Sequence, residues 1–136
     1  MSLAQSHVIH LAIDSPFERV VDFLSGARNF LKWAAVRGQM TRLSELEWMV
    51  QTEFGERIVR FSPRNEFGVF DHAVYKPGDR PVTMPLQIIP NENGCDLVFL
   101  FPRRPGVTDE QFASSVEWVT SDFLALRALL EAPVRP

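Results

Sequence analysis

The sequence contains one cysteine, Cys95, so no disulfide bond can form within the chain. It also lacks an apolar run long enough to span a bilayer, and we therefore expect no membrane insertion. A secretory signal has a basic segment followed by an apolar one, and the first eleven residues lack this pattern. A cytoplasmic location is the default expectation.

The sequence also lacks a large excess of either positive or negative charge. The 14 Lys and Arg residues and 17 Asp and Glu residues give a formal net charge of −3. Basic residues occur in short isolated pieces such as Arg103-Arg104, so we expect no binding of nucleic acid. His7 and His10 fall on opposite faces of one predicted strand, and no cysteine pair accompanies them, so no metal site is expected.

Motifs of the common catalytic classes are missing as well. The sequence has no Gly-x-Ser-x-Gly elbow, no phosphate-cradling glycine loop and no dinucleotide fingerprint. These absences argue against hydrolysis by an activated serine and against the use of ATP. We expect no cofactor.

What the sequence does have is the composition of a folded domain rich in aromatic residues. Apolar residues make up 46% and charged residues 23% of the 136 residues, which is typical of a globular chain. Eleven Phe and three Trp can fill a core or line a cavity. Without repeats or linkers, residues 1–136 are predicted to form a single domain.

The N-terminal quarter predicts one strand and two short helices. Apolar and polar residues alternate over 7–14, as in a half-buried strand. Ser15 as N-cap, Pro16 at the first helical position and Glu18 in a capping box then predict a helix. A second short helix is expected over 27–35.

The middle of the chain carries the signals of strands joined by turns. Six strands are expected, at 40–43, 47–53, 56–62, 67–75, 82–89 and 95–101. Asn93-Gly94 favours the positive φ angles of a hairpin turn. Pro85 within its run indicates an edge or a bulge.

The end of the chain predicts a long helix. Thr108 and Gln111 form a capping box, and Pro133 ends the pattern. Apolar residues recur at steps of three and four for about six turns. The stripe consists of Phe112, Val116, Val119, Phe123, Leu126 and Leu130. The acidic residues Asp109, Glu110 and Asp122 are expected to face solvent.

This order of elements predicts a cavity. An antiparallel sheet of this length has one buried face, and the terminal helix is the only element long enough to cover it. A curved sheet and a single helix cannot close along their whole length. We therefore expect a gap where the short helices arrive, and such gaps are usual ligand sites.

The element order, the run Ser15-Pro16-Phe17-Glu18-Arg19-Val20, Trp33, and the run Asn65-Glu66-Phe67-Gly68-Val69-Phe70-Asp71-His72 together resemble the SRPBCC superfamily. This is the helix-grip fold of polyketide cyclase-like, START-like and birch-pollen-allergen-like proteins. The resemblance implies an α+β fold with a curved antiparallel sheet of about seven strands around the C-terminal helix. Its members range from lipid carriers to cyclases, hydrolases and chaperone co-factors, so it implies the fold more than the function.

Strand parity selects the side chains that face the predicted cavity. Arg57 points inward with Val59, and His72 points inward with Phe70. The predicted ligand-binding residues are Trp33, Arg57, Phe70, His72, Met84, Phe99 and Trp118.

Each polar candidate has a structural alternative. Arg57 could hold a carboxylate or lie at the hairpin end and extend to water. His72 could move a proton or be a hydrogen-bonded core histidine. Trp33 and Trp118 could wall a cavity or only fill the core.

Three hypotheses about function remain open. The leading one is the binding of a small hydrophobic or aromatic ligand between the sheet and the C-terminal helix. The second is a polyketide or aromatic cyclase-like enzyme in which Arg57 orients an enolate and His72 moves a proton. The third is a chaperone-activator-like interaction module, which would need an exposed apolar patch. The sequence also leaves a homodimer open.

Overall fold

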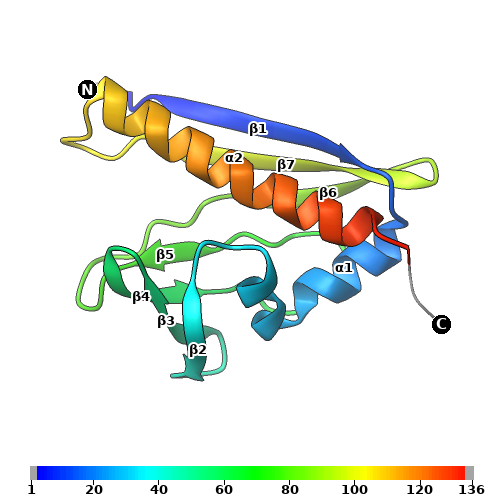
Figure 1. The fold of residues 1–136 in the computed structure, drawn as a ribbon, viewed down its shortest axis with the longest axis horizontal. Helices are drawn as coiled ribbons and strands as arrows, with labels where there is room; N and C mark the ends of the chain where they lie inside the picture. The colour runs from blue at the N-terminus through cyan, green and yellow to red at the C-terminus, as the bar shows by residue number, and fades with distance from the viewer. Residues whose placement is uncertain (1–2, 134–136) are drawn as a thin grey trace.

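The computed structural model describes residues 3–133. Ten helices and strands lie in this part of the chain. In chain order they are β1 (Ser6–Ile13), α1 (Phe17–Ser25), the 3₁₀ helix η1 (Ala27–Lys32), β2 (Arg37–Arg42), β3 (Glu47–Thr52), β4 (Gly55–Arg60), β5 (Ala73–Tyr75), β6 (Leu86–Asn91), β7 (Gly94–Pro102) and α2 (Asp109–Glu131). Figure 1 shows α2 running along the β1, β7 and β6 strands, with β2 to β5 further down. The predicted α+β class with about seven strands is confirmed.

The strands form two antiparallel sheets, ordered β1-β7-β6 and β2-β3-β4-β5. The segment 68–72 joins them. It forms single bridges to β6 and the residues before it, at Val69 with Gln87 and at His72 with Met84. The two sheets therefore form one curved surface whose regular pairing is interrupted between β5 and β6.

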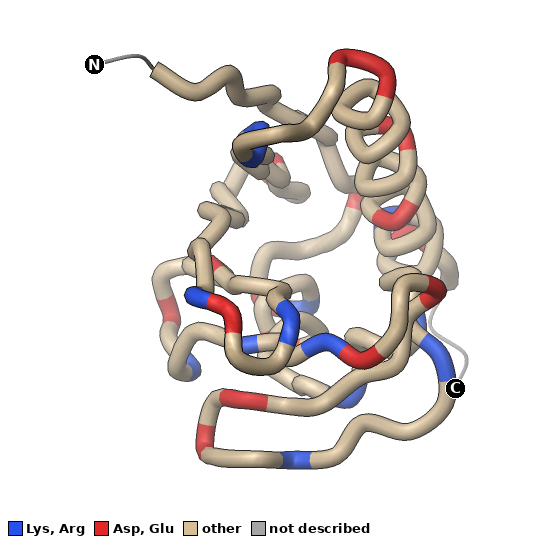
Figure 2. The backbone as a smooth tube through the Cα atoms, turned by 90° about the vertical axis from the view of Figure 1, so that its left-hand side faces the viewer, with Lys and Arg blue, Asp and Glu red and all other residues tan. Residues whose placement is uncertain are grey.

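One hydrophobic core connects the layers. The side chains of Val20 in α1, Val59 in β4, Leu97 in β7 and Leu126 in α2 are all fully buried. Figure 2, seen from the side, shows α2 on one side of the molecule and the curved strands around the other. Basic and acidic residues are interspersed along the tube, in agreement with the small net charge.

The long helix begins as predicted. The Thr108 side chain accepts a hydrogen bond from the Gln111 backbone N–H, and the Gln111 side chain accepts one from the Thr108 N–H. These two bonds satisfy donors that have no partner inside the helix. The capping box predicted for this helix is therefore confirmed.

The capping box predicted at Ser15 is wrong. Helix α1 begins at Phe17 with Pro16 at the N-cap, and no side chain caps it. The tight corner after β1 turns Ser15 inward, where its carbonyl lies 3.7 Å from the Cys95 Sγ. Within the described residues the Ser15 Oγ has no hydrogen-bond partner.

The strand predicted over 67–75 is mostly irregular. The Asn65 side chain accepts bonds from the N–H groups of Phe67 and Val69 and donates to the carbonyls of Pro63 and Val69, which folds this segment into a loop. Gly68 has a φ of 79°. Regular pairing is therefore restricted to β5.

The other differences from the predicted elements are local. The short helix expected over 27–35 is a 3₁₀ helix that ends at Lys32. In the β6–β7 hairpin the positive φ occurs at Glu92 and not in the Asn93-Gly94 pair. Gly94 is needed for another reason, because a Cβ there would lie 2.6 Å from the Ile13 carbonyl oxygen.

Candidate functional site

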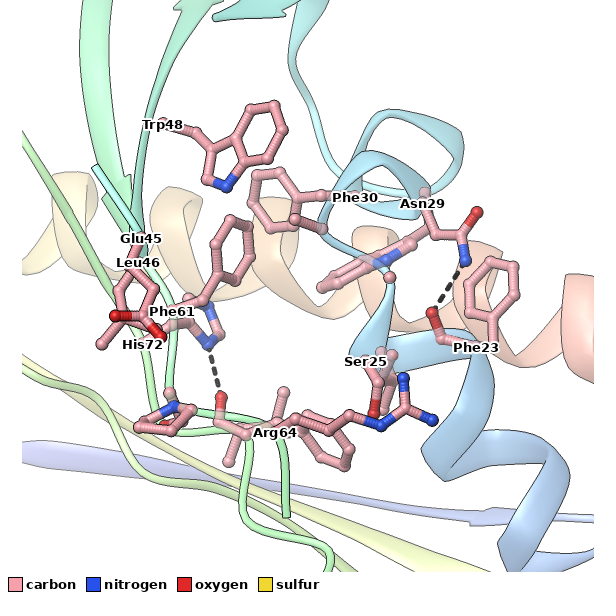
Figure 3. A pocket seen from close by; sticks show the side chains of 18 residues that line it. Phe23, Ser25, Asn29, Phe30, Glu45, Leu46, Trp48, Phe61, Arg64 and His72 are labelled. Carbon is pink, nitrogen blue, oxygen red and sulfur yellow. Dashed lines mark hydrogen bonds between the residues drawn. The ribbon is translucent and has the colours of Figure 1, made fainter. Parts of the chain in front are cut away.

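Two hollows in the described part of the chain could hold a ligand, and no residue lines both of them. The first, which we call the inner pocket, has a volume of about 240 Å³. It lies between the short helices on one side and β3 with the segment after β4 on the other. Figure 3 shows Phe23, Phe30, Trp48 and Phe61 around it. Its walls are therefore mainly aromatic.

His72 is the buried polar group of the inner pocket. Its Nδ1 lies 3.0 Å from the Phe70 carbonyl oxygen, and only 8% of the residue is exposed. Since a carbonyl can only accept, this bond places the ring proton on Nδ1 and leaves a lone pair on Nε2. Burial lowers the pKa of the His72 side chain, and the bond to Phe70 and the charge of Asp71 oppose that shift. The ring is therefore neutral near pH 7.

The other uncharged polar side chains that line the inner pocket bond to the backbone. Ser25 Oγ donates to the Val21 carbonyl at 2.7 Å, and Asn29 Nδ2 donates to the Phe23 carbonyl at 2.9 Å. Ser62 Oγ donates to the Asp71 carbonyl. Their hydrogen-bonding capacity is therefore largely directed to the protein itself.

An aromatic cluster fills the interior next to the inner pocket. Trp33 stacks on Phe123 of α2 with a centroid distance of 5.4 Å, and Phe99 of β7 lies 4.9 Å from Phe123. The His72 ring stacks on Phe99 at 5.8 Å and lies edge-on to Phe30 at 6.3 Å. Part of the predicted cavity is therefore occupied by the protein's own rings.

The second hollow, the helix groove, lies between α2 and the sheet. Its volume is about 690 Å³, and its lining residues come from the β3–β4 hairpin, β5, β7 and the first half of α2. Phe54 at the tip of the hairpin contacts Trp118 of α2 with a centroid distance of 5.9 Å. Both side chains are exposed to solvent, at 72% and 41%. The groove lies between the sheet and the C-terminal helix, as predicted for a ligand site, but no residue of the short helices lines it. The gap was predicted where the short helices arrive, and the hollow at that place is the inner pocket.

Arg57 is the cation of the helix groove. It is half-buried, and its Nη1 donates to the Glu56 carbonyl at 2.8 Å, so the guanidinium lies toward the end of the hairpin. Glu53, which also lines the groove, is paired with Arg37 at 2.9 Å. Arg57 makes no salt bridge within the described residues.

The seven predicted ligand-binding residues occupy three places. Those lining the inner pocket are Trp33, Phe70 and His72. Those lining the helix groove are Arg57 and Trp118. Those buried in the core, outside both linings, are Met84 and Phe99. A reaction that uses Arg57 and His72 on one small substrate is therefore not favoured by this arrangement.

Asp122 is a residue for which the prediction was wrong. It was expected on the solvated face of the terminal helix, yet it is half-buried and its Oδ2 accepts a hydrogen bond from the Ala35 N–H at 3.2 Å. Burial raises the pKa of this carboxyl to about 6, and the bond from Ala35 opposes the shift. A sequence signal exists, because Asp122 precedes Phe123 of the buried stripe and so borders the covered face of α2.

Residues 3–133 contain neither a metal-binding cluster nor a membrane-spanning helix. No three His, Cys, Asp or Glu side chains gather there in a way that could hold a metal ion. No helix of that part of the chain is long and apolar enough to cross a bilayer. Cys95 is buried, and burial raises the pKa of its thiol.

Comparison with known proteins gives the fold. No family model matches this chain, and no curated protein is similar to it in sequence. Solved structures are similar: an uncharacterised protein from Bacillus thuringiensis aligns with a TM-score of 0.71 at 16% identity, covering 94% of this chain and 100% of the other. Ara h 8.0201 aligns with a TM-score of 0.69 at 10% identity, covering 94% and 98%. This chain has the helix-grip fold.

A third solved structure, with a name unrelated to those of the first two, has the same fold. The Aha1 dimer from Colwellia psychrerythraea aligns with a TM-score of 0.71 at 13% identity, covering 93% of this chain and 96% of the other. The resemblance to the SRPBCC superfamily is thus confirmed at the level of the helix-grip fold. At such identities a shared fold does not establish a shared ligand, partner or activity.

Proposed function

We propose that this protein binds a small hydrophobic or aromatic molecule in the helix groove. The observation that carries the proposal is the size and lining of the groove. Its volume of about 690 Å³ is within the range of about 300–1,000 Å³ that is usual for ligand pockets. Apolar side chains from both sides, among them Val74, Phe101, Trp118 and Val119, line it.

The groove also has one charged group suited to orient a ligand. Arg57 uses a single donor on the Glu56 carbonyl, and the guanidinium has further N–H groups. A carboxylate at the end of an apolar ligand would accept from these donors. We therefore expect amphipathic ligands with one anionic end to bind better than neutral ones of the same size.

A fluorescent aromatic anion, 1-anilinonaphthalene-8-sulfonate, tests this proposal. We expect it to bind with one-to-one stoichiometry, to gain fluorescence, and to shift the indole N–H signal of Trp118 in two-dimensional NMR spectra. Ser114 is exposed and lines the groove, so Ser114→Trp should fill the space and weaken binding at least about tenfold.

Ser121→Trp is the matched control. Ser121 is also exposed on α2, two turns further along, and lies outside the groove lining. The control variant should bind the probe like the wild type. Absence of one-to-one binding, or equal affinity in the two tryptophan variants, would contradict the proposal.

A further inference from the structure

The inner pocket differs from the helix groove in the chemistry it offers. Each lining includes one arginine. Arg57 in the groove makes no salt bridge among the described residues, whereas Arg64 in the inner pocket is 75% exposed at its side chain and lies 3.6 Å from the Asp22 carboxylate. The buried polar group of the inner pocket is the neutral imidazole of His72. Within the described residues the His72 Nε2 makes no hydrogen bond, and it is not among the fully enclosed polar atoms that lack a partner. It is therefore an acceptor that remains available to a molecule in the pocket.

A donor is available in the same space. Trp48 lines the inner pocket, and Figure 3 shows its indole nitrogen turned toward the pocket interior. Among the described residues the indole N–H of Trp48 has no hydrogen-bond acceptor. The Arg28 guanidinium, 5.0 Å from the centre of the Trp48 ring, covers this side chain.

The ring of His72 is held in place and cannot easily turn toward another partner. Phe99 stacks on it, Phe30 lies edge-on to it, and the Phe70 carbonyl holds Nδ1. A fixed acceptor in a largely aromatic pocket discriminates by hydrogen bonding, since a ligand without a donor would leave that acceptor buried and unpaired, which is costly. A carboxylate would face the lone pair of Nε2 and be repelled.

We propose that the inner pocket is a second ligand site, which takes a neutral single-ring molecule carrying a hydroxyl or amide N–H that donates to His72 Nε2. Size limits the ligand to about one ring, because a 150 Å³ apolar cavity in another protein holds benzene and this pocket has about 240 Å³. The site is separate from the helix groove and does not depend on the function proposed for it.

Two molecules of equal size test the proposal. p-Cresol carries a hydroxyl, and p-xylene has a methyl group in its place. We expect p-cresol to bind the wild type about tenfold more tightly, the ratio that one hydrogen bond to a buried acceptor supplies. 4-Methylbenzoate should not bind at this site.

The three tryptophans report where each molecule binds. Trp33 and Trp48 line the inner pocket and Trp118 lines the groove, so NMR signals of their indole N–H groups distinguish the two sites. p-Cresol should shift the signals of Trp33 and Trp48 and leave that of Trp118 unchanged. Ser114→Trp, which fills the groove, should leave the affinity for p-cresol unaltered.

Two substitutions of His72 isolate the acceptor. His72→Asn keeps a donor near the Phe70 carbonyl and removes the atom at the Nε2 position, so the preference for p-cresol over p-xylene should fall to about one. His72→Gln reaches further and should retain part of the preference. The ratio of affinities is measured because each variant also changes the volume of the pocket.

Three results would overturn the proposal. The first is equal affinity of the wild type for p-cresol and p-xylene. The second is a p-cresol response at Trp118 without one at Trp33 and Trp48. The third is no detectable binding of p-cresol up to its solubility limit. The comparison of the two molecules on the wild type needs no variant, so it holds even if a His72 variant fails to fold.

Discussion

At the scale of single residues, the buried His72 and the half-buried Asp122 link stability to pH in opposite directions. Burial raises the pKa of Asp122 to about 6 and lowers the pKa of His72. The raised pKa of Asp122 adds stability below about pH 4, which is lost as pH rises through 6. The lowered pKa of His72 has the reverse effect, since the unfolded imidazole gains a proton below about pH 6.5 and the folded one does so only at lower pH.

We predict that Asp122→Asn removes the Asp122 contribution. Asparagine keeps an oxygen that can accept from the Ala35 N–H but cannot ionise. The free energy of unfolding of the variant, minus that of the wild type, should therefore increase as pH rises from about 5 to about 7.5. Urea denaturation at the two pH values measures this difference, and the His72 contribution cancels in it.

The control for Asp122→Asn is Glu117→Gln, which removes one negative charge from the exposed face of the same helix. A general effect of net charge would act on both variants alike. If both show the same change with pH, the burial of Asp122 is not its cause.

The sequence predicted the position of His72 better than that of Asp122. His72 was placed on the inward face because alternation along the strand fixes the face of each side chain. Alternation does not show how far along the sheet each side chain lies. It therefore predicted one cavity for His72 and Arg57, although they line different hollows. The burial of Asp122 depends on the backbone after η1, which no local pattern predicts.

At the scale of elements, α2 depends on how its first turn is capped. The N-terminal half of this helix lines the groove, so fraying of its first turn would widen that site. Thr108 and Gln111 satisfy two backbone donors, and Asp109 and Glu110 add negative charge where the helix dipole favours it.

We predict that Thr108→Ala lowers the free energy of unfolding by about 1 kcal/mol, which is typical for loss of an N-cap. Hydrogen exchange of the amides at 110–113 should accelerate more than that of amides near the centre of α2. Ser121→Ala is the control, since Ser121 is exposed in the helix interior, where alanine is favourable. A loss as large in Ser121→Ala would show that the cap is not the cause.

The two capping boxes show what sequence can predict of an element. Both have a hydroxyl residue followed three positions later by Glu or Gln, yet the box forms only at Thr108. The helix there begins after an exposed loop, so the side chain is free to fold back onto the backbone. Ser15 lies in a buried corner between β1 and α1, where packing decides its direction.

At the scale of the whole molecule, the interior is divided rather than hollow throughout. The sequence predicts the fold because strand, hairpin and helix signals are local, and the solved structures with this arrangement confirm it. The division depends on four rings from three distant parts of the chain: Phe30 with Trp33, Phe99, and Phe123. These rings meet because of how the chain packs. Composition alone showed only that the aromatic residues could either fill a core or line a cavity.

The segment 68–72 joins the two sheets and so fixes the positions of the two hollows relative to each other. Ile88 N–H donates to the Gly68 carbonyl at 2.8 Å, and Phe70 N–H donates to the Leu86 carbonyl at 2.8 Å. His72, at the end of this segment, also lines the inner pocket. Displacement of Gly68 would therefore affect the join and the pocket together.

We predict that Gly68→Ala destabilises the protein far more than Gly78→Ala. Both glycines have positive φ, at 79° and 89°, so each alanine costs roughly 1–2 kcal/mol in backbone strain. A Cβ at Gly78 meets open space, whereas one at Gly68 would lie 2.2 Å from the Ile88 carbonyl oxygen. Backbone must then move, which adds roughly 1–3 kcal/mol. Denaturant unfolding gives both values, and amides of the segment 68–72 should lose hydrogen-exchange protection only in Gly68→Ala. Equal losses of stability in the two variants would mean that the sheets do not depend on this close approach.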